Sequence, residues 1–203
     1  MKIPVDTSVE TETTPRWSTK QLTTMALLCS LAILLGFVEF PIFPAAPFLK
    51  YDPSFVPIII TGLIYGPAAG LSIGVVEIGI HGLIMGDFPG SAMNLLVVIG
   101  FVLPACLIYK KHRSLKGAIV GLVVSVICSV AMAIAGNLVI TPFYIGAPVD
   151  AVIEMIIPIL LPFNAMKAVL NAVLTLIVYK SISNLVTPLK DQVSGRKQKD
   201  ENK

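Results

Sequence analysis

Charged residues are scarce in this sequence. Only 13% of the 203 residues are Asp, Glu, Lys or Arg, whereas 55% are hydrophobic. Ordinary globular domains carry roughly twice that share of charge, so the composition excludes a water-soluble domain. The formal net charge is only +3, and the charges fall in loops and tails, so no nucleic-acid partner is expected.

Cysteines and catalytic motifs are also few. Cys29, Cys106 and Cys128 are odd in number, far apart and surrounded by apolar residues, so neither disulfides nor a metal site is expected. The sequence has no GxxxxGK[ST] phosphate loop and no HExxH motif, which are the signatures of a P-loop ATPase and of a zinc protease. We therefore expect no enzymatic activity, and energy for uphill transport would come from another subunit or a coupled ion.

Long apolar runs make up most of the chain and are broken by proline and glycine. They predict about six membrane-spanning helices, at residues 23–42, 55–65, 68–85, 92–109, 115–140 and 153–179. The second run is short for a full span. Residues 1–20 and 187–203 are predicted to be polar tails, and the first tail is too polar for a cleaved signal. The prediction is an all-α integral membrane protein with one membrane domain, residues 21–186.

The basic residues predict the orientation in the membrane, because an excess of Lys and Arg marks the cytoplasmic side. Residues 110–116, between the fourth and fifth runs, contain three lysines and an arginine, and the C-terminal tail is also basic. With six spans, this connection lies on the same side as both termini. Both termini are therefore predicted to be cytoplasmic.

Polar residues inside the apolar runs are candidates for function, since a charge at a helix centre costs roughly 2.5 to 3.5 kcal/mol. Glu77 and His81 are four residues apart and share a helix face, either as a structural pair or in direct contact with a ligand or proton. Asn164, Lys167 and Asn171 form a second polar stripe. Lys167 either contacts a bound polar solute or extends to the outer interface.

Several further residues are predicted near the outer ends of the helices. Asn94 and Asn137 should lie at a depth similar to Asn164, and amides on three helices suit a heterocyclic or amide-bearing ligand. Aromatic and basic residues could cap this pocket or form an interfacial belt; they are Phe48, Lys50, Tyr51 and Tyr144. Ala26 and Ser30 form a small-xxx-small pair, for a partner subunit or for packing within the chain.

Several stretches, taken in order, resemble one transporter family. They are Phe48-Leu49-Lys50-Tyr51-Asp52, Gly66-Pro67-Ala68-Ala69-Gly70, Met93-Asn94, Phe101-Val102-Leu103-Pro104, Ile108-Tyr109-Lys110, Asn137, Pro142-Phe143-Tyr144 and Leu161-Pro162-Phe163-Asn164 with Lys167. In order and spacing they resemble the S components of energy-coupling factor (ECF) vitamin transporters, closest to the riboflavin-specific type. The similarity covers about residues 22–186.

The resemblance implies a six-helix, multi-pass subunit in a bacterial cell membrane that captures a vitamin at its outer face. It implies riboflavin as transported ligand rather than cofactor, and partnership with a transmembrane coupling subunit and two cytoplasmic ATPases. Ala26 and Ser30 match the place where such proteins carry an Ala-xxx-Ala surface for the coupling subunit. The binding roles it implies are hydrogen bonds from Asn94, Asn137 and Asn164 and a charge-assisted contact from Lys167.

The third run departs from the riboflavin type, where Glu-Leu-Ile-Lys-Asn is usual. Here Glu77 is followed by Ile-Gly-Ile and then His81, so pantothenate or another vitamin stays an alternative ligand. Glu77 and His81 also suggest two other classes. A solitary transporter could use them as a proton relay, and a membrane enzyme acting on a lipid could use them as acid and base.

Overall fold

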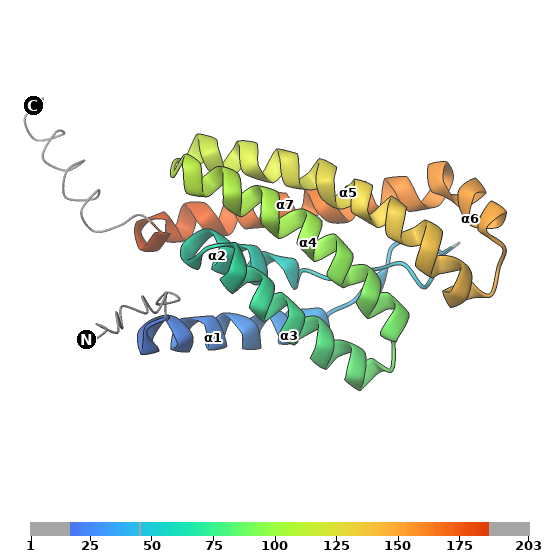
Figure 1. Ribbon diagram of the computed structural model, residues 1–203, viewed down its shortest axis with the longest axis horizontal. Helices are drawn as coiled ribbons and strands as arrows, with labels where there is room; N and C mark the ends of the chain where they lie inside the picture. The colour runs from blue at the N-terminus through green and yellow to red at the C-terminus, as the bar shows by residue number, and fades with distance from the viewer. Residues whose placement is uncertain (1–16, 45, 187–203) are drawn as a thin grey trace, which may run out of the picture.

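A computed structural model describes residues 17–44 and 46–186 of the chain. The polar tails predicted at residues 1–20 and 187–203 lie almost wholly outside this part. The described chain forms a bundle of elongated helices, shown in Figure 1. They are α1 Thr19–Gly36, α2 Phe55–Tyr65, α3 Pro67–Met85, α4 Phe88–Lys111, α5 Leu115–Ile145, α6 Val149–Met155 and α7 Leu161–Val186, with a π-helical turn, η1 Ile156–Leu160, joining α6 to α7.

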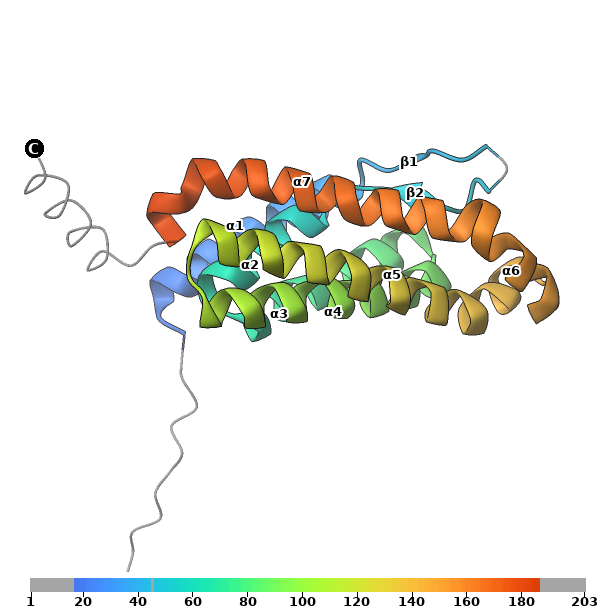
Figure 2. The same cartoon turned by 90° about the horizontal axis from the view of Figure 1, so that it is seen from above.

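The helices run alternately up and down the long axis of the bundle (Figures 1 and 2). The start of α1, the α2–α3 and α4–α5 connections and the end of α7 gather at one end. The α3–α4 turn, the α5–α6 connection and a small β-hairpin lie toward the other end. Because the basic connection at residues 110–116 belongs to the first end, the opposite end is the one predicted to face outward.

Five of the helical rods are long and apolar enough to cross a membrane, counting α6 to α7 as one continuous rod. Helix α2 is apolar but has only 11 residues, which confirms the short second run. Helix α2 lies in the interior of the bundle, since every residue from Phe55 to Leu63 is buried. Large aliphatic side chains are exposed on the outer helices, as in α3, α5 and α7, and hydrocarbon chains of lipid would cover them.

Glycine and proline determine where α2 ends and α3 begins. Gly66 has φ +98°, a backbone conformation that an L-residue with a side chain adopts only under strain. Pro67 follows at the first position of α3, where its missing N–H needs no partner. The predicted break at Gly66-Pro67 is confirmed.

Some predicted boundaries were wrong at the outward end. The first run was expected to stay helical to Ile42, but α1 ends at Gly36 and Phe40–Pro41 forms strand β1, antiparallel to β2 Lys50–Tyr51. Pro41 cannot donate a helical hydrogen bond, and a ladder edge tolerates it. The last run begins at Val149, earlier than the expected residue 153, and Pro158 lies in the π-helical turn that accommodates its missing N–H.

Candidate functional site

A cavity opens at the hairpin end of the bundle. It has about 800 Å³ of empty space when its open mouth is counted. Its polar lining consists of Glu39, Lys50, Asp52, His81, Asp87, Ser91, Asn94, Asn137, Thr141, Asn164 and Lys167. Its apolar lining includes Phe48, Leu49, Met93, Val97, Ile140, Tyr144 and Phe163. A mixture of a few polar groups and apolar walls is typical of small-molecule sites.

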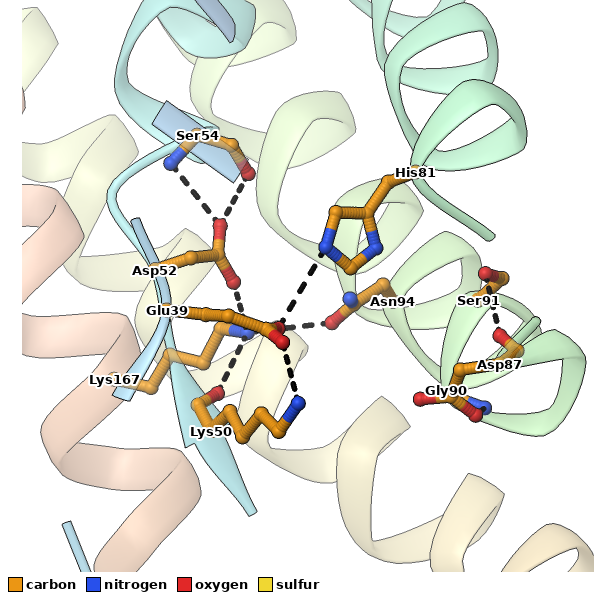
Figure 3. A network of polar contacts seen from close by, with 10 residues as sticks. All are labelled: Glu39, Lys50, Asp52, Ser54, His81, Asp87, Gly90, Ser91, Asn94 and Lys167. Carbon is orange, nitrogen blue, oxygen red and sulfur yellow. Dashed lines mark hydrogen bonds and ion pairs between the residues drawn. The ribbon is translucent and has the colours of Figure 1, made fainter. Parts of the chain in front are cut away.

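Lys167 is the centre of the polar lining (Figure 3). Its ammonium donates to Oδ2 of Asp52 at 2.9 Å, to Oδ1 of Asn94 at 3.3 Å and to the main-chain oxygen of Lys50 at 3.5 Å. The same nitrogen lies 5.2 Å from the ring centroid of Phe55. Lys167 is only 6% exposed, so it does not extend to the interface. It holds together α7, α4 and the hairpin.

Asp52 supplies the counter-charge that a buried lysine needs. It follows β2, is 6% exposed, and accepts hydrogen bonds from the main-chain N–H of Ser54 at 3.1 Å and from the Ser54 hydroxyl. Burial alone would raise the pKa of Asp52, but the charge of Lys167 and the bonds from Ser54 outweigh it and hold the pKa below its usual value. The Asp52 side chain is therefore a carboxylate at neutral pH.

The lowered pKa of Asp52 predicts a pH-dependent contribution to folding. Because the folded-state value lies below the unfolded one, this contribution is present above about pH 4 and disappears as the pH falls through the folded-state value. At pH 7 we expect Asp52→Asn to cost about 3 to 5 kcal/mol of unfolding free energy, because it leaves the buried ammonium of Lys167 without a carboxylate. Thermal unfolding in detergent from pH 7 to pH 3 should show the gap to wild type closing below about pH 4.

Asp150→Asn is the matched control for this measurement, because Asp150 is exposed at the start of α6. It should show no gap at pH 7. A wild-type advantage over Asp52→Asn that stays constant down to pH 3 would contradict the assigned charge state.

The amide side chains of the cavity are held in fixed orientations. Nδ2 of Asn164 donates to the carbonyl of Leu160 at 2.8 Å, and Nδ2 of Asn137 donates to that of Ala133 at 2.7 Å. A carbonyl only accepts, so the amide nitrogens must face these oxygens. Oδ1 of Asn137 also accepts from Thr141. Within the described chain, Oδ1 of Asn164 and Nδ2 of Asn94 make no hydrogen bond, which leaves an acceptor and a donor for a ligand.

The hairpin closes one side of the cavity. Lys50 forms an ion pair with Glu39, and Nε2 of His81 lies 3.6 Å from the other oxygen of Glu39. The hydrogen bond to Glu39 is the main reason that the pKa of Lys50 is raised. Nearby, the rings of Phe48 and Tyr144 are 5.8 Å apart. Ionic and aromatic contacts thus join the hairpin to α3 and α5.

Most of the residues predicted for ligand binding line this cavity, but two do not. Glu77 is buried with its carboxylate against Gly36 of α1, and it makes no hydrogen bond with His81 in the described chain. The reason is that the side chain of His81 turns to Glu39 instead. Tyr51 is 6% exposed and packs edge-on against Phe40, with ring centroids 5.5 Å apart, because it lies on the covered face of the hairpin.

Sequence reasoning missed five polar lining residues: Glu39, Asp52, Asp87, Ser91 and Thr141. Asp52 could have been found by asking which acid neutralises the single lysine within the apolar runs. Thr141 is four residues after Asn137, which puts the two on one helix face. Glu39 and Asp87 lie in connections, and no pattern in the sequence brings them to a common site.

Two other predictions concern residues away from the cavity, and one motif there was overlooked. Ala26 and Ser30 are both exposed on α1, so they are accessible to a partner, and that role stays a prediction. The three cysteines are free. Residues 70–74 have the GxSxG spacing of a hydrolase, but they lie within α3 and Ser72 donates to the main chain of Ala68, whereas a nucleophile elbow is a strand-to-helix turn.

The sequence is similar to that of known transport proteins. Residues 20–179 match the family described as ECF transporter, substrate-specific component. A riboflavin transporter named RibU, from Staphylococcus aureus (strain TCH60), is 29% identical over 174 residues, which cover 82% of this chain and 92% of that protein. A riboflavin transporter named FmnP, from Bacillus subtilis (strain 168), is 36% identical over 131 residues, 62% of this chain and 68% of that protein.

A solved structure also resembles the chain. It is described as the S component of a bacterial ECF transporter, and the two folds superpose with a TM-score of 0.73 at 30% sequence identity. The similarity covers 83% of this chain and 98% of the other. The two proteins therefore share their fold over most of both chains.

Proposed function

Because the chain belongs to the family of ECF transporter substrate-specific components, we propose that it is a riboflavin-binding S component of a bacterial cell membrane. Two named riboflavin transporters are among its relatives. The observation that carries the proposal is the cavity built around Lys167, whose polar groups face a space walled by aromatic and aliphatic side chains.

The cavity chemistry suits a flavin. The pyrimidine edge of the flavin ring has one N–H donor and two carbonyl acceptors, while its dimethylbenzene edge is apolar. Oδ1 of Asn164 can accept from the N–H, and Nδ2 of Asn94 can donate to one carbonyl. The Lys167 ammonium can donate to the other carbonyl in exchange for its 3.5 Å bond to the main-chain oxygen of Lys50. Phe48, Tyr144 and Phe163 provide apolar surface for the ring system. The hydroxyl groups of the ribityl chain would bond to the remaining polar residues near the mouth.

Transport would require partners. The described chain carries no phosphate loop, so we propose that a coupling subunit and two cytoplasmic ATPases supply the driving force, as the family name implies. With both termini cytoplasmic, the cavity faces the outside and can capture the vitamin there. The exposed Ala26/Ser30 face of α1 is the proposed contact for the coupling subunit, since small residues allow close helix approach.

The contacts of Glu77 and His81 argue against the proton-relay alternative. In a relay the two side chains would exchange a proton directly, but Glu77 contacts Gly36 and His81 faces Glu39. The same contacts do not form the Glu77–His81 acid–base pair expected for a membrane enzyme acting on a lipid. Binding followed by coupled release fits the arrangement better.

Alanine substitution of the two amides tests the placement of the ligand. Asn94→Ala and Asn164→Ala should each weaken riboflavin binding about five- to tenfold, because each removes about 1 kcal/mol of hydrogen bonding. Quenching of riboflavin fluorescence by the protein in detergent measures the affinity.

Asn184 lies outside the cavity-lining segments, in the last turns of α7, and Asn184→Ala is the control that should bind as wild type does. Affinities within about twofold of wild type for both cavity variants would show that the ligand lies elsewhere.

A further inference from the structure

The charges that line the cavity are unequal in number, and this inequality bears on which ligands it accepts. Lys50 and Lys167 face three carboxylates, those of Glu39, Asp52 and Asp87. Lys50 is paired with Glu39, and Lys167 is paired with Asp52 at 2.9 Å. Each lysine therefore already has a carboxylate partner. An anionic ligand would have to compete with that carboxylate for either cation.

Asp87 is the third of these carboxylates, and neither Lys50 nor Lys167 is paired with it. No ion pair to it is found in the part of the chain that the structure describes, where the three pairs are Lys50–Glu39, His81–Glu39 and Lys167–Asp52. It occupies the turn between α3 and α4, and Figure 3 shows it beyond His81 and Asn94 from the Lys167 cluster. Its negative charge therefore acts on the cavity without a neighbouring cation in contact.

The same residue fills the place where an anion would otherwise bind. The N-terminus of a helix attracts anions through its unpaired N–H groups, and α4 begins beside the cavity at Phe88. Asp87 caps this helix, because its Oδ1 accepts from the N–H of Gly90 at 2.9 Å. A side chain at position 90 would collide with the carboxylate, so the glycine permits the close cap. The protein's own carboxylate occupies the anion-binding end of α4.

From this arrangement we infer that Asp87 is a specificity-determining residue that selects a neutral flavin over its phosphate ester and over carboxylate-bearing vitamins. The inference rests on the proposed function and names the charge of the ligand that the site accepts. Electrostatic repulsion against the wrong ligand is a common source of specificity. Asp87 acts directly, as a wall of the cavity, and needs no conformational change.

The test compares riboflavin with its 5′-phosphate, which share the flavin ring and differ by a phosphate of about two negative charges at pH 7. Flavin fluorescence quenching gives both dissociation constants for wild type, Asp87→Asn and Glu154→Gln. Asparagine is as good a helix cap as aspartate, so the first variant removes charge and keeps the cap. Glu154 is exposed on α6 and does not line the cavity, so the second variant makes the same change of net charge elsewhere.

The wild-type protein should bind the phosphate at least about tenfold more weakly than riboflavin, and Asp87→Asn should reduce this ratio about fivefold or more. Glu154→Gln should leave the ratio as in wild type. An unchanged ratio in Asp87→Asn, or an equal change in both variants, would overturn the inference. Asp87→Ser, another neutral cap, gives the same comparison if the Asn variant does not fold.

Ionic strength provides a second readout for wild type and Asp87→Asn. Raising the ionic strength from about 0.05 to 0.5 M shortens the screening length from about 14 to about 4 Å, so the wild-type ratio should fall while the ratio of Asp87→Asn changes less. Equal salt responses of the two proteins would also overturn the role of Asp87. If wild type binds riboflavin but the ratios do not move, only this inference fails. If wild type binds neither flavin, the proposed function itself fails, and this inference with it.

Discussion

Replacing Lys167 with methionine is expected to weaken riboflavin binding by about 100-fold or more. A charge-assisted hydrogen bond contributes roughly 1.5 to 3 kcal/mol, and the substitution also releases Asp52 and Asn94, which Lys167 holds in place. Methionine is of similar length, so the packing against Phe55 is largely retained. The titration of flavin fluorescence in detergent measures the loss.

The same substitution should lower stability, because it leaves the carboxylate of Asp52 buried without a cation. Removing one partner of a buried ion pair costs about 3 to 5 kcal/mol. The double variant Asp52→Asn/Lys167→Met removes both charges and should recover much of this stability without recovering binding. Thermal unfolding of the two variants separates the structural role of Lys167 from its contact with the ligand.

Lys110→Met is the matched control for this experiment. Lys110 lies in the exposed last turn of α4, at the end of the bundle away from the cavity. The Lys110→Met variant should bind riboflavin as wild type does and unfold at nearly the same temperature. Binding by Lys167→Met within a few-fold of wild type would contradict the central place of this residue in the site.

Gly70→Val is expected to cause a large loss of stability outside the site. Helices α2 and α3 touch here through their backbones. A Cβ atom at Gly70 would lie 2.9 Å from the Cα atom of Gly62 and 3.0 Å from the carbonyl oxygen of Ile58. Neither backbone atom can move without displacing the buried helix α2. Forcing side-chain volume into such a contact costs about 3 kcal/mol or more, which corresponds to a fall in Tm of roughly 6 to 12 °C.

Gly79→Val, in the same helix, provides the control. A Cβ atom at Gly79 would have no heavy atom within 4 Å, and the residue is exposed on the outer surface. The two variants make the same chemical change with the same effect on helix propensity. If Gly79→Val lowered the unfolding temperature as much as Gly70→Val, the loss would come from propensity and not from the contact between α2 and α3.

Local signals in the sequence were sufficient for most of the helices. The Gly66-Pro67 pair marks a break that depends only on backbone geometry, so the end of α2 and the start of α3 could be predicted from the residues themselves. The end of α1 could not. Residues 37–42 are apolar apart from Glu39. They become loop and strand because β1 pairs with β2, whose residues follow about ten positions later.

The site shows the same division between local and distant contacts. The amides of Asn137 and Asn164 and the charge of Lys167 stood out because they interrupt apolar runs. The partner of Lys167 is Asp52, which is 115 residues away in the sequence. Their pairing depends on how the hairpin folds over the helix ends. The pairing of Glu77 with His81 was plausible from their spacing, but Glu39 competes for His81 in three dimensions.

Titration of the wild-type protein with riboflavin tests the central claim most directly. The purified chain in detergent is titrated while flavin fluorescence is followed, with pantothenate as competitor. The account predicts saturable quenching with a dissociation constant on the order of nanomolar, and no reversal by excess pantothenate, which carries a carboxylate. Folded protein that leaves riboflavin fluorescence unchanged, or that exchanges riboflavin for pantothenate, would contradict it.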